Sequence, residues 1–256
     1  MSAEAPRDAK TEGTGHVIGL GTLINTALIV AGGLAGLAGG RFLVPRMQDA
    51  LMKATAVCVL FVGLGGAMEQ MLSVEGGHLA SGGTAMMVIA MAAGTLLGEL
   101  LDLEARIERL GTWLRRRTGS EGDTGFVNAF VTASLTVSIG AMAIVGSIQD
   151  GMAGDWSTLA LKGAIDALIV CVMTASMGVG CMWSALPVLV FEGGITLLAR
   201  ALQSLMTAAA LANLSLVGSL LIFCVGVNLI RPKTFRVANM LPAVVIAAAL
   251  AFVPGF

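Results

Sequence analysis

The sequence predicts an all-α membrane protein with several transmembrane helices, and three observations lead to this prediction. Of the 256 residues, 56% are hydrophobic and only 12% are charged, and the mean hydropathy is +0.89. Apolar stretches of about twenty residues recur along the chain, and each is long enough to cross a bilayer core of roughly 30 Å. A β-barrel would instead show alternating strands of about ten residues. A soluble domain has nowhere to bury this much apolar surface.

The apolar stretches between charged or Gly/Pro-rich breaks divide the chain into expected spans. These spans are 17–40, 53–68, 82–101, 125–149, 159–180, 182–203, 210–230 and 238–255. Residues 1–16 are polar and lack the apolar core of a signal peptide, so we expect a disordered extracytoplasmic N-terminus. Residues 17–256 then form a single transmembrane domain, and no soluble domain fits inside it.

The basic residues predict the orientation of the spans. The loops 41–52, 102–124 and 231–237, with Lys53 at the edge of the first, hold eleven of the fifteen Lys and Arg residues. The loops 69–81 and 150–158 carry acids and no Lys or Arg. An even number of spans puts the three basic loops on one side, which the positive-inside rule makes the cytoplasm. Both termini are then extracytoplasmic.

A shift of 161 residues reveals a weak internal repeat. It places residues 31–40 on 192–201, so that the pairs Gly32–Gly33 and Gly193–Gly194 coincide. The first repeat would cover 17–101 and the second 182–256. Between them lie the basic cytoplasmic loop 102–124 and two connecting spans within 125–180, so the repeats run in opposite directions. Inverted repeats are typical of secondary transporters, although a duplicated protein that transports nothing would show the same pattern.

Glu192 is the strongest candidate for a binding residue. It lies about 15 Å into the span 182–203, near the middle of the bilayer, where an ionisable group costs about 3 kcal/mol. Pro187 and the pair Gly193–Gly194 weaken the helix around it, and with Gly32–Gly33 they predict broken helices in spans one and six, whose freed backbone would complete the site. We expect a coupling cation or proton here; a protonated glutamate bonded to a neighbouring helix is the structural alternative.

Asp166 is the second deep acid, about 10 Å into the span 159–180. Lys162 precedes it by four residues, so a neutralised structural pair competes with a functional role. Because almost no loop joins spans five and six, Asp166 and Glu192 can approach each other in a hairpin and share one proton or cation. Asn25 in span one is the neutral polar residue that we would test, although such residues more often hold helices together.

The motifs of soluble enzymes are missing from the sequence. It contains no H-E-x-x-H, no P-loop and no C-x-x-C spacing among its four cysteines. We therefore expect no enzyme activity and no cofactor, while the question of a metal ion stays open. The run 115–117 of three arginines lies beside the membrane, where it sets the topology rather than binding nucleic acid. Gly32, Gly36 and Gly40 form a small-residue ridge that suits packing within the chain or in a homo-oligomer.

Four stretches of the sequence resemble a known family in their order and spacing. They are GTLINTALIVAGGLAG at 21–36, GAMAIVGSIQDG at 140–151, SALPVLVFEGGITLLA at 184–199 and NMLPA at 239–243. Together they resemble the YdfK/YqgA-like family (domain of unknown function number 554), and the likeness runs from about residue 17 to residue 255. It implies a bacterial inner-membrane protein of transporter type with no assigned substrate. It also adds Gln149 and Asp150, at the outer end of span four, to the candidate site.

The function that we expect is secondary transport of a small solute or ion by alternating access, coupled to a proton or cation through Glu192 and Asp166. The partners would be that solute or ion and the lipid bilayer. An ion channel and a non-transporting scaffold or sensor are the alternatives. An intramembrane enzyme is the least expected class, because the sequence offers no visible pair of nucleophile and base.

Overall fold

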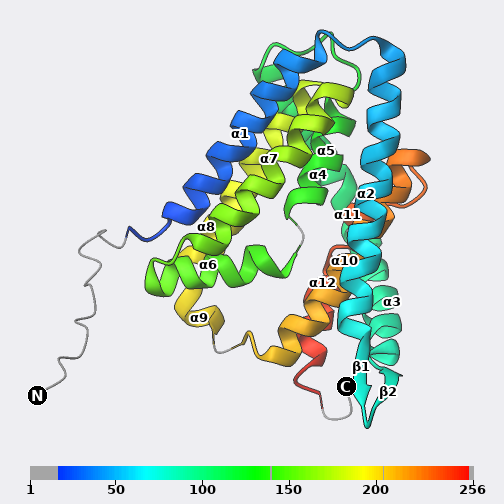
Figure 1. Cartoon of the computed structure of the whole chain (residues 1–256), viewed down its shortest axis with the longest axis vertical. Coiled ribbons are helices and arrows are strands. Elements are labelled where there is room, and N and C mark those ends of the chain that lie inside the picture. The colour runs from blue at the N-terminus through cyan, green and yellow to red at the C-terminus, as the bar shows by residue number, and fades with distance from the viewer. Residues whose placement is uncertain (1–16, 139, 204, 254–256) are drawn as a thin grey trace, which may run out of the picture.

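The computed structural model describes residues 17–138, 140–203 and 205–253 (Figure 1). The expected disordered N-terminus, residues 1–16, lies outside the described residues. The described elements in chain order are α1 (Leu20–Gly40), α2 (Pro45–Met71), β1 (Leu72–Glu75), β2 (His78–Ser81), α3 (Thr84–Leu101), α4 (Leu103–Arg117), α5 (Phe126–Ser138), α6 (Ala141–Ala153), α7 (Ser157–Met177), the 3-10 helix η1 (Val179–Ser184), α8 (Ala185–Leu197), α9 (Ala199–Gln203), α10 (Ala208–Ile230), α11 (Val237–Met240) and α12 (Pro242–Leu250). The two strands pair as an antiparallel hairpin, with Leu72 opposite Ser81.

The prediction of an all-α membrane protein is confirmed, but the count of eight spans is not. Among the described residues, six helical segments are long and apolar enough to cross a bilayer, and the pair α5–α6 adds a seventh if it counts as one bent span. The last expected span, 238–255, corresponds to the shorter apolar segment Val237–Leu250. That segment falls below the roughly 20 residues that a span normally needs.

The helix breaks do not lie where the sequence predicted them. α1 continues through Gly32–Gly33, and α8 continues through Gly193–Gly194, so the predicted breaks at both glycine pairs are wrong. The span predicted as continuous over 125–149 is instead divided into α5 and α6, which are bent by 65° relative to each other. A glycine inside a helix costs only about 1 kcal/mol, and the packing of a neighbouring helix easily outweighs that cost.

The helices form two lobes, which Figure 1 shows beside each other. The first lobe contains α1 and α5 to α9, and the second contains α2, α3 and α10 to α12. In the first lobe α1 packs so closely along α7 that a Cβ atom at Gly32 would overlap the carbonyl oxygen of Ala167. In the second lobe α2 packs along α10, and α3 packs along α11 and α12, where a Cβ atom at Gly94 would overlap the backbone of Ala243.

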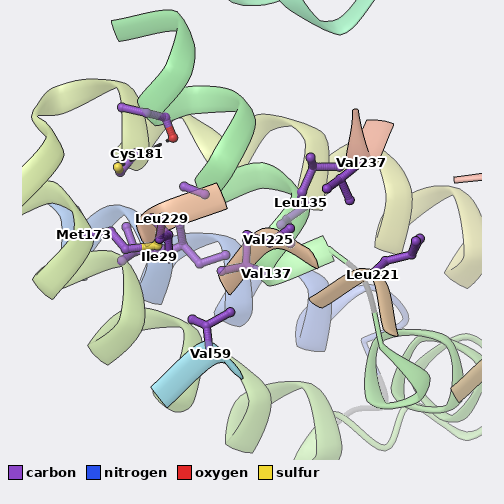
Figure 2. Packing of buried hydrophobic residues seen from close by; sticks show 14 of the residues in the cluster. Ile29, Val59, Leu135, Val137, Met173, Cys181, Leu221, Val225, Leu229 and Val237 are labelled. Carbon is purple, nitrogen blue, oxygen red and sulfur yellow. Dashed lines mark hydrogen bonds between the residues drawn. The ribbon is translucent and has the colours of Figure 1, made fainter. Parts of the chain in front are cut away.

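One apolar cluster joins the two lobes (Figure 2). Ile29 and Met173 contribute to it from the first lobe, and Val59 and Leu221 contribute from the second. All four side chains are at most 4% exposed. The surface between the lobes at this cluster is therefore apolar, and apolar contacts carry no directional bonds that would fix one relative position.

The three basic loops lie at one end of the molecule. Arg236, which precedes α11, forms ion pairs with Glu99 at 2.6 Å and with Asp102 at 2.8 Å, at the end of α3. Arg41 and Asp123 line one cavity of about 380 Å³. The β1–β2 hairpin lies at the other end of α2, and Figure 1 shows it at the bottom of the view. This shared end agrees with the predicted orientation, while its assignment to the cytoplasm of a bacterial inner membrane stays a prediction.

Candidate functional site

A cluster of buried polar side chains lies inside the first lobe. Asn25 comes from α1, Lys162 and Asp166 come from consecutive turns of α7, and Glu192 comes from α8. Asn25 and Glu192 are 0% exposed, Asp166 is 5% exposed and Lys162 is 6% exposed. The structure therefore brings together the two deep acids, as the short connection between spans five and six predicted.

Lys162 is the centre of the cluster. Its ammonium group donates to Asp166 Oδ2, donates to the carbonyl oxygen of Val137 at 2.7 Å, and lies 3.3 Å from Glu192 Oε1. An ammonium group has three N–H donors, so these three acceptors account for its full hydrogen-bonding capacity. Asn25 Nδ2 donates to the same Glu192 Oε1 at 2.7 Å. Lys162 therefore binds both acids, rather than forming a simple pair with Asp166 alone.

The charges in this cluster do not balance. One ammonium group faces two carboxyl groups, so the cluster carries a charge of −1 if both acids are ionised. Glu192 Oε2 and Asn25 Oδ1 are buried and have no hydrogen-bond partner among the described residues. Buried charges and polar atoms are nearly always paired or bonded to water. One proton or one cation would therefore neutralise the charge of −1, and it could bond to the oxygen atoms that have no partner.

The carbonyl oxygen that Lys162 binds lies at the C-terminal end of α5. Val137 is the second-last residue of α5. The last carbonyl groups of a helix accept no hydrogen bond from an amide of the same helix, so they are free to bind another donor. These carbonyls also form the negative end of the helix dipole, which favours a cation. A discontinuous helix whose end meets a charged group is the geometry of many ion-coupled sites. The sequence predicted helix breaks in spans one and six, not in the span that contains α5, and it did not point to Val137.

Asp150 lies beside the start of α1, and neither Asp150 nor Gln149 belongs to the charged cluster. Asp150 is 0% exposed, and its Oδ2 accepts hydrogen bonds from the amides of Gly21 at 3.1 Å and Thr22 at 3.4 Å. It thus caps α1 from another helix, and no side chain caps this helix at Gly19. Gln149 Oε1 accepts from the hydroxyl of Thr158 at 2.7 Å. The family resemblance pointed to both residues, and the structure gives each a local partner.

A pair of buried hydroxyl groups lies between Asp150 and the charged cluster. Thr22 Oγ1 and Thr196 Oγ1 are 3.2 Å apart and join α1 to α8. Thr22 lies one turn before Asn25 on α1, and Thr196 lies one turn after Glu192 on α8. Neither threonine was predicted from the sequence to belong to the site. Their spacing of three and four residues from Asn25 and Glu192 on the same helices was the available signal.

The four glycines of the predicted site pack helices or leave open space. A Cβ atom at Gly33 would overlap the side chain of Met182, which packs α1 against η1. Nothing lies within 4 Å of a Cβ atom at Gly194, and its carbonyl oxygen accepts from the amide of Leu198 at 3.1 Å. The predicted role of freed backbone at these glycine pairs is therefore wrong. Within the described residues, no group of three or more His, Cys, Asp or Glu side chains is placed to hold a metal ion.

Comparisons with known proteins show which family the chain belongs to. A family model described as a protein of unknown function, DUF554, matches residues 20–252. The chain belongs to the DUF554 family. The uncharacterized membrane protein YdfK of Bacillus subtilis is 26% identical over 91% of this chain and 96% of its own length. The uncharacterized protein YqgA of Escherichia coli is 26% identical over 90% of this chain and 95% of its own length. No solved structure matches.

Proposed function

We propose that this DUF554 protein is a secondary transporter of a small solute or ion that works by alternating access and is coupled to a proton or cation through Glu192. The observation that carries the proposal is the position of Lys162. Its ammonium group binds Asp166, Glu192 and the carbonyl end of α5 at once. A change of charge on the acids would therefore alter a bond that holds the end of a discontinuous span.

The arrangement of the helices supports the predicted inverted repeat. The shift of 161 carries α1 onto 181–201, which η1, α8 and α9 occupy, and it carries α2 onto 206–232, which α10 occupies. The helices that this shift relates are in contact, α1 with α8 and α2 with α10. Each pair is antiparallel: along α1 and α8, for example, Thr22 contacts Thr196 while Asn25 contacts Glu192. Antiparallel partners are what an inverted duplication requires.

The repeats and the lobes divide the chain differently. The first helix of each repeat, α1 or α8, lies in the first lobe, while α2, α3, α10 and α12 lie in the second. Each lobe thus contains equivalent helices from both repeats. Motion of one lobe against the other would expose the space between them first to one side of the membrane and then to the other, which is the essence of alternating access.

Two cavities between the lobes offer space for a solute. One, of about 480 Å³, lies among α5, α8 and α12 and is mostly apolar, with Ser134 among its lining residues. The other, of about 410 Å³, lies nearer the basic loops and is lined by Glu104, Glu108 and Lys233. Burial raises the pKa of Glu104 above its ordinary value. Leu135 is 8% exposed and borders both cavities, so it forms a wall between them.

The test combines ligand screening with transport. Purified wild type, Glu192→Gln and the control Asp49→Asn are screened in detergent micelles for thermal stabilisation by metabolites and inorganic ions. Asp49 is exposed and pairs only with Lys53 in the described structure, so its substitution controls for the loss of one carboxylate. A stabilising ligand is then offered to proteoliposomes under an imposed gradient of protons or sodium. We expect wild type and Asp49→Asn to accumulate it, and Glu192→Gln to fail.

Other outcomes favour the rival classes. Ion currents far above the turnover of any carrier would favour a channel. A protein that no ligand stabilises, and in which Glu192→Gln changes only the stability of an oligomer, would favour a scaffold or sensor. Uptake that ignores ion gradients and survives Glu192→Gln would contradict the proposed coupling.

A further inference from the structure

We infer that the coupling ion is a proton. It enters at the N-terminal end of α1 and reaches Glu192 along Asp150 and the Thr22–Thr196 hydroxyl pair. This inference rests on the proposed function, because it names the ion and its route for the same site. Three features of the first lobe support it. An ammonium group already occupies the place of a metal cation, and buried oxygen atoms form a row. An oxygen atom at each end of this row has no hydrogen-bond partner among the described residues.

The place that a metal cation would take is already occupied by the ammonium group of Lys162. Two carboxylates and a helix-terminal carbonyl are ligands that suit a small cation, and here all three face Lys162 Nζ. A second cation at the same oxygens would meet the repulsion of an ammonium group in surroundings of low dielectric constant. A proton avoids this conflict, because it converts one carboxylate into a neutral carboxylic acid and brings the charge of the cluster from −1 to zero.

The buried oxygen atoms form a row between α1 and α8. Asp150 is held at the first turn of α1 by its hydrogen bonds to the amides of Gly21 and Thr22. The Thr22–Thr196 hydroxyl pair follows, and Asn25 and Glu192 lie one helical turn further along the same two helices. Asp150 and Thr196 are 0% and 4% exposed. The row therefore runs from the start of α1, at the end away from the basic loops, to the charged cluster.

Each end of this row has an oxygen atom without a partner. Asp150 Oδ1 and Glu192 Oε2 are both buried and have no hydrogen-bond partner among the described residues. Leaving such atoms unsatisfied costs about 1–3 kcal/mol each, so water molecules are the expected partners. Water on both sides of the threonine pair would complete a continuous chain of hydrogen bonds.

A proton can move stepwise along this chain of hydrogen bonds. Asp150 accepts a proton through the water molecule expected at its buried Oδ1, and a hydroxyl group can accept one proton while it gives up another. The transfer ends with a new O–H bond on Glu192, and Asp150 returns to its ionised form. The charged groups that face Glu192 are Lys162 and Asp166 on α7, while Asp155 follows Asp150 outside α6. Hydrogen bonds from Ser157 hold the pKa of Asp155 below its usual value, so it stays ionised near the outer end of the row.

The experiment measures protonation of Glu192 directly in the purified full-length protein. The infrared carbonyl band of a protonated carboxyl group is assigned to Glu192 by subtracting the spectrum of Glu192→Gln, and its loss is followed after a jump from acidic to alkaline pH. We expect the double variant Thr22→Val/Thr196→Val to slow this loss about tenfold or more, because a missing relay group raises the barrier to proton transfer. The variant Thr22→Ser/Thr196→Ser keeps both hydroxyl groups and should keep the wild-type rate.

Thr26→Val is the matched control. Thr26 lies on the same helix, but its hydroxyl group donates to the carbonyl oxygen of Thr22 at 2.8 Å and lies outside the row, so its loss should leave the rate unchanged. A double valine variant as fast as wild type would overturn the route. If the double variant does not fold, the two single valine variants replace it with the same expectation.

Sodium provides the second arm. At fixed pH and ionic strength, replacing choline with sodium should leave the Glu192 band unchanged. A band that weakens in sodium would overturn the proton in favour of a metal cation, and it would leave the transport proposal intact. A band that is absent, or that does not change with pH, would also overturn the inference. Conversely, a normal band in a protein that accumulates no solute would contradict transport alone.

Discussion

The two lobes pack their helices by the same device but differ in what they bury. In the first lobe α1 approaches α7 through Gly32 and Gly36, and in the second α3 approaches α11 and α12 through Gly94 and Gly98. Only the first lobe, within the described residues, buries an ammonium group and two carboxyl groups against one another. In the second lobe the ion pairs of Arg236 lie at the exposed end of α3.

This difference shows that close helix packing and buried charge are separable within one helical protein. Close helix contacts at glycines need no charged groups, and they stabilise the packing inside each lobe. The buried charges of the first lobe do not add much stability, because removing them from water costs about as much as their attraction returns. Their position in the first lobe is what the proposed ion coupling requires, and the second lobe serves as an internal reference for testing it.

The largest effect should come from removing the centre of the charged cluster. Lys162→Met leaves two buried acids and the Val137 carbonyl without their donor, so we expect a loss of about 3–5 kcal/mol of stability. The measurement is the midpoint of thermal unfolding in detergent micelles. Lys53→Met is the control, because the Lys53–Asp49 pair is exposed. A Lys162→Met protein as stable as wild type would show that the acids are already neutral without the ammonium group.

Asparagines in the two lobes offer the next comparison. Asn25→Ala removes the donor to a buried carboxyl group, and we expect it to cost about 2–3 kcal/mol. Asn213 donates to the Ala247 carbonyl at 3.2 Å in the second lobe and is only partly buried, so Asn213→Ala should cost about 1 kcal/mol or less. Thermal unfolding of both variants checks this order, and equal losses would break the distinction between the lobes.

Glycine substitutions should affect both lobes equally. Gly32→Ala would push a methyl group into Ala167 of the first lobe, and Gly94→Ala would push one into Ala243 of the second. We expect each to cost about 2 kcal/mol, which is typical of overpacking. Gly39→Ala is the control on α1, because nothing lies within 4 Å of its Cβ position. A large loss in one lobe alone, again in thermal unfolding, would mean that the lobes do not share this device.

The smallest effect should come from the ion pairs of the second lobe. Arg236→Gln removes two contacts whose side chains are 40–54% exposed, so we expect a loss of at most about 1 kcal/mol. The loss should shrink further as the salt concentration rises, because exposed charges are screened. Unfolding midpoints at low and high salt provide the check. A salt-independent loss would place Arg236 in a more buried role than its exposure indicates.

Much of the candidate site was predicted from the sequence, and most of the errors in that prediction have one cause. Glu192, Asp166 and Asn25 were selected because polar groups deep in apolar spans are costly, and all three meet in the structure. The break was misplaced because glycines lower helix propensity without specifying where a helix stops. At Gly178, where the chain leaves α7, a positive φ of 98° does require a glycine, and here the predicted boundary near 180 was close. Nothing in the sequence marked the Val137 carbonyl, because its role depends on a tertiary contact.

The bond between Asn25 and Glu192 also has a consequence for biosynthesis. The two residues are 167 positions apart, so α1 enters the membrane long before its partner on α8 has been made. A neutral amide tolerates that wait better than a carboxylate would. α7 carries Lys162 and Asp166 on adjacent turns and so brings its own counter-charge into the lipid. Asn25, Lys162 and Asp166 all precede Glu192 in the chain, so every side-chain partner of Glu192 is synthesised before it.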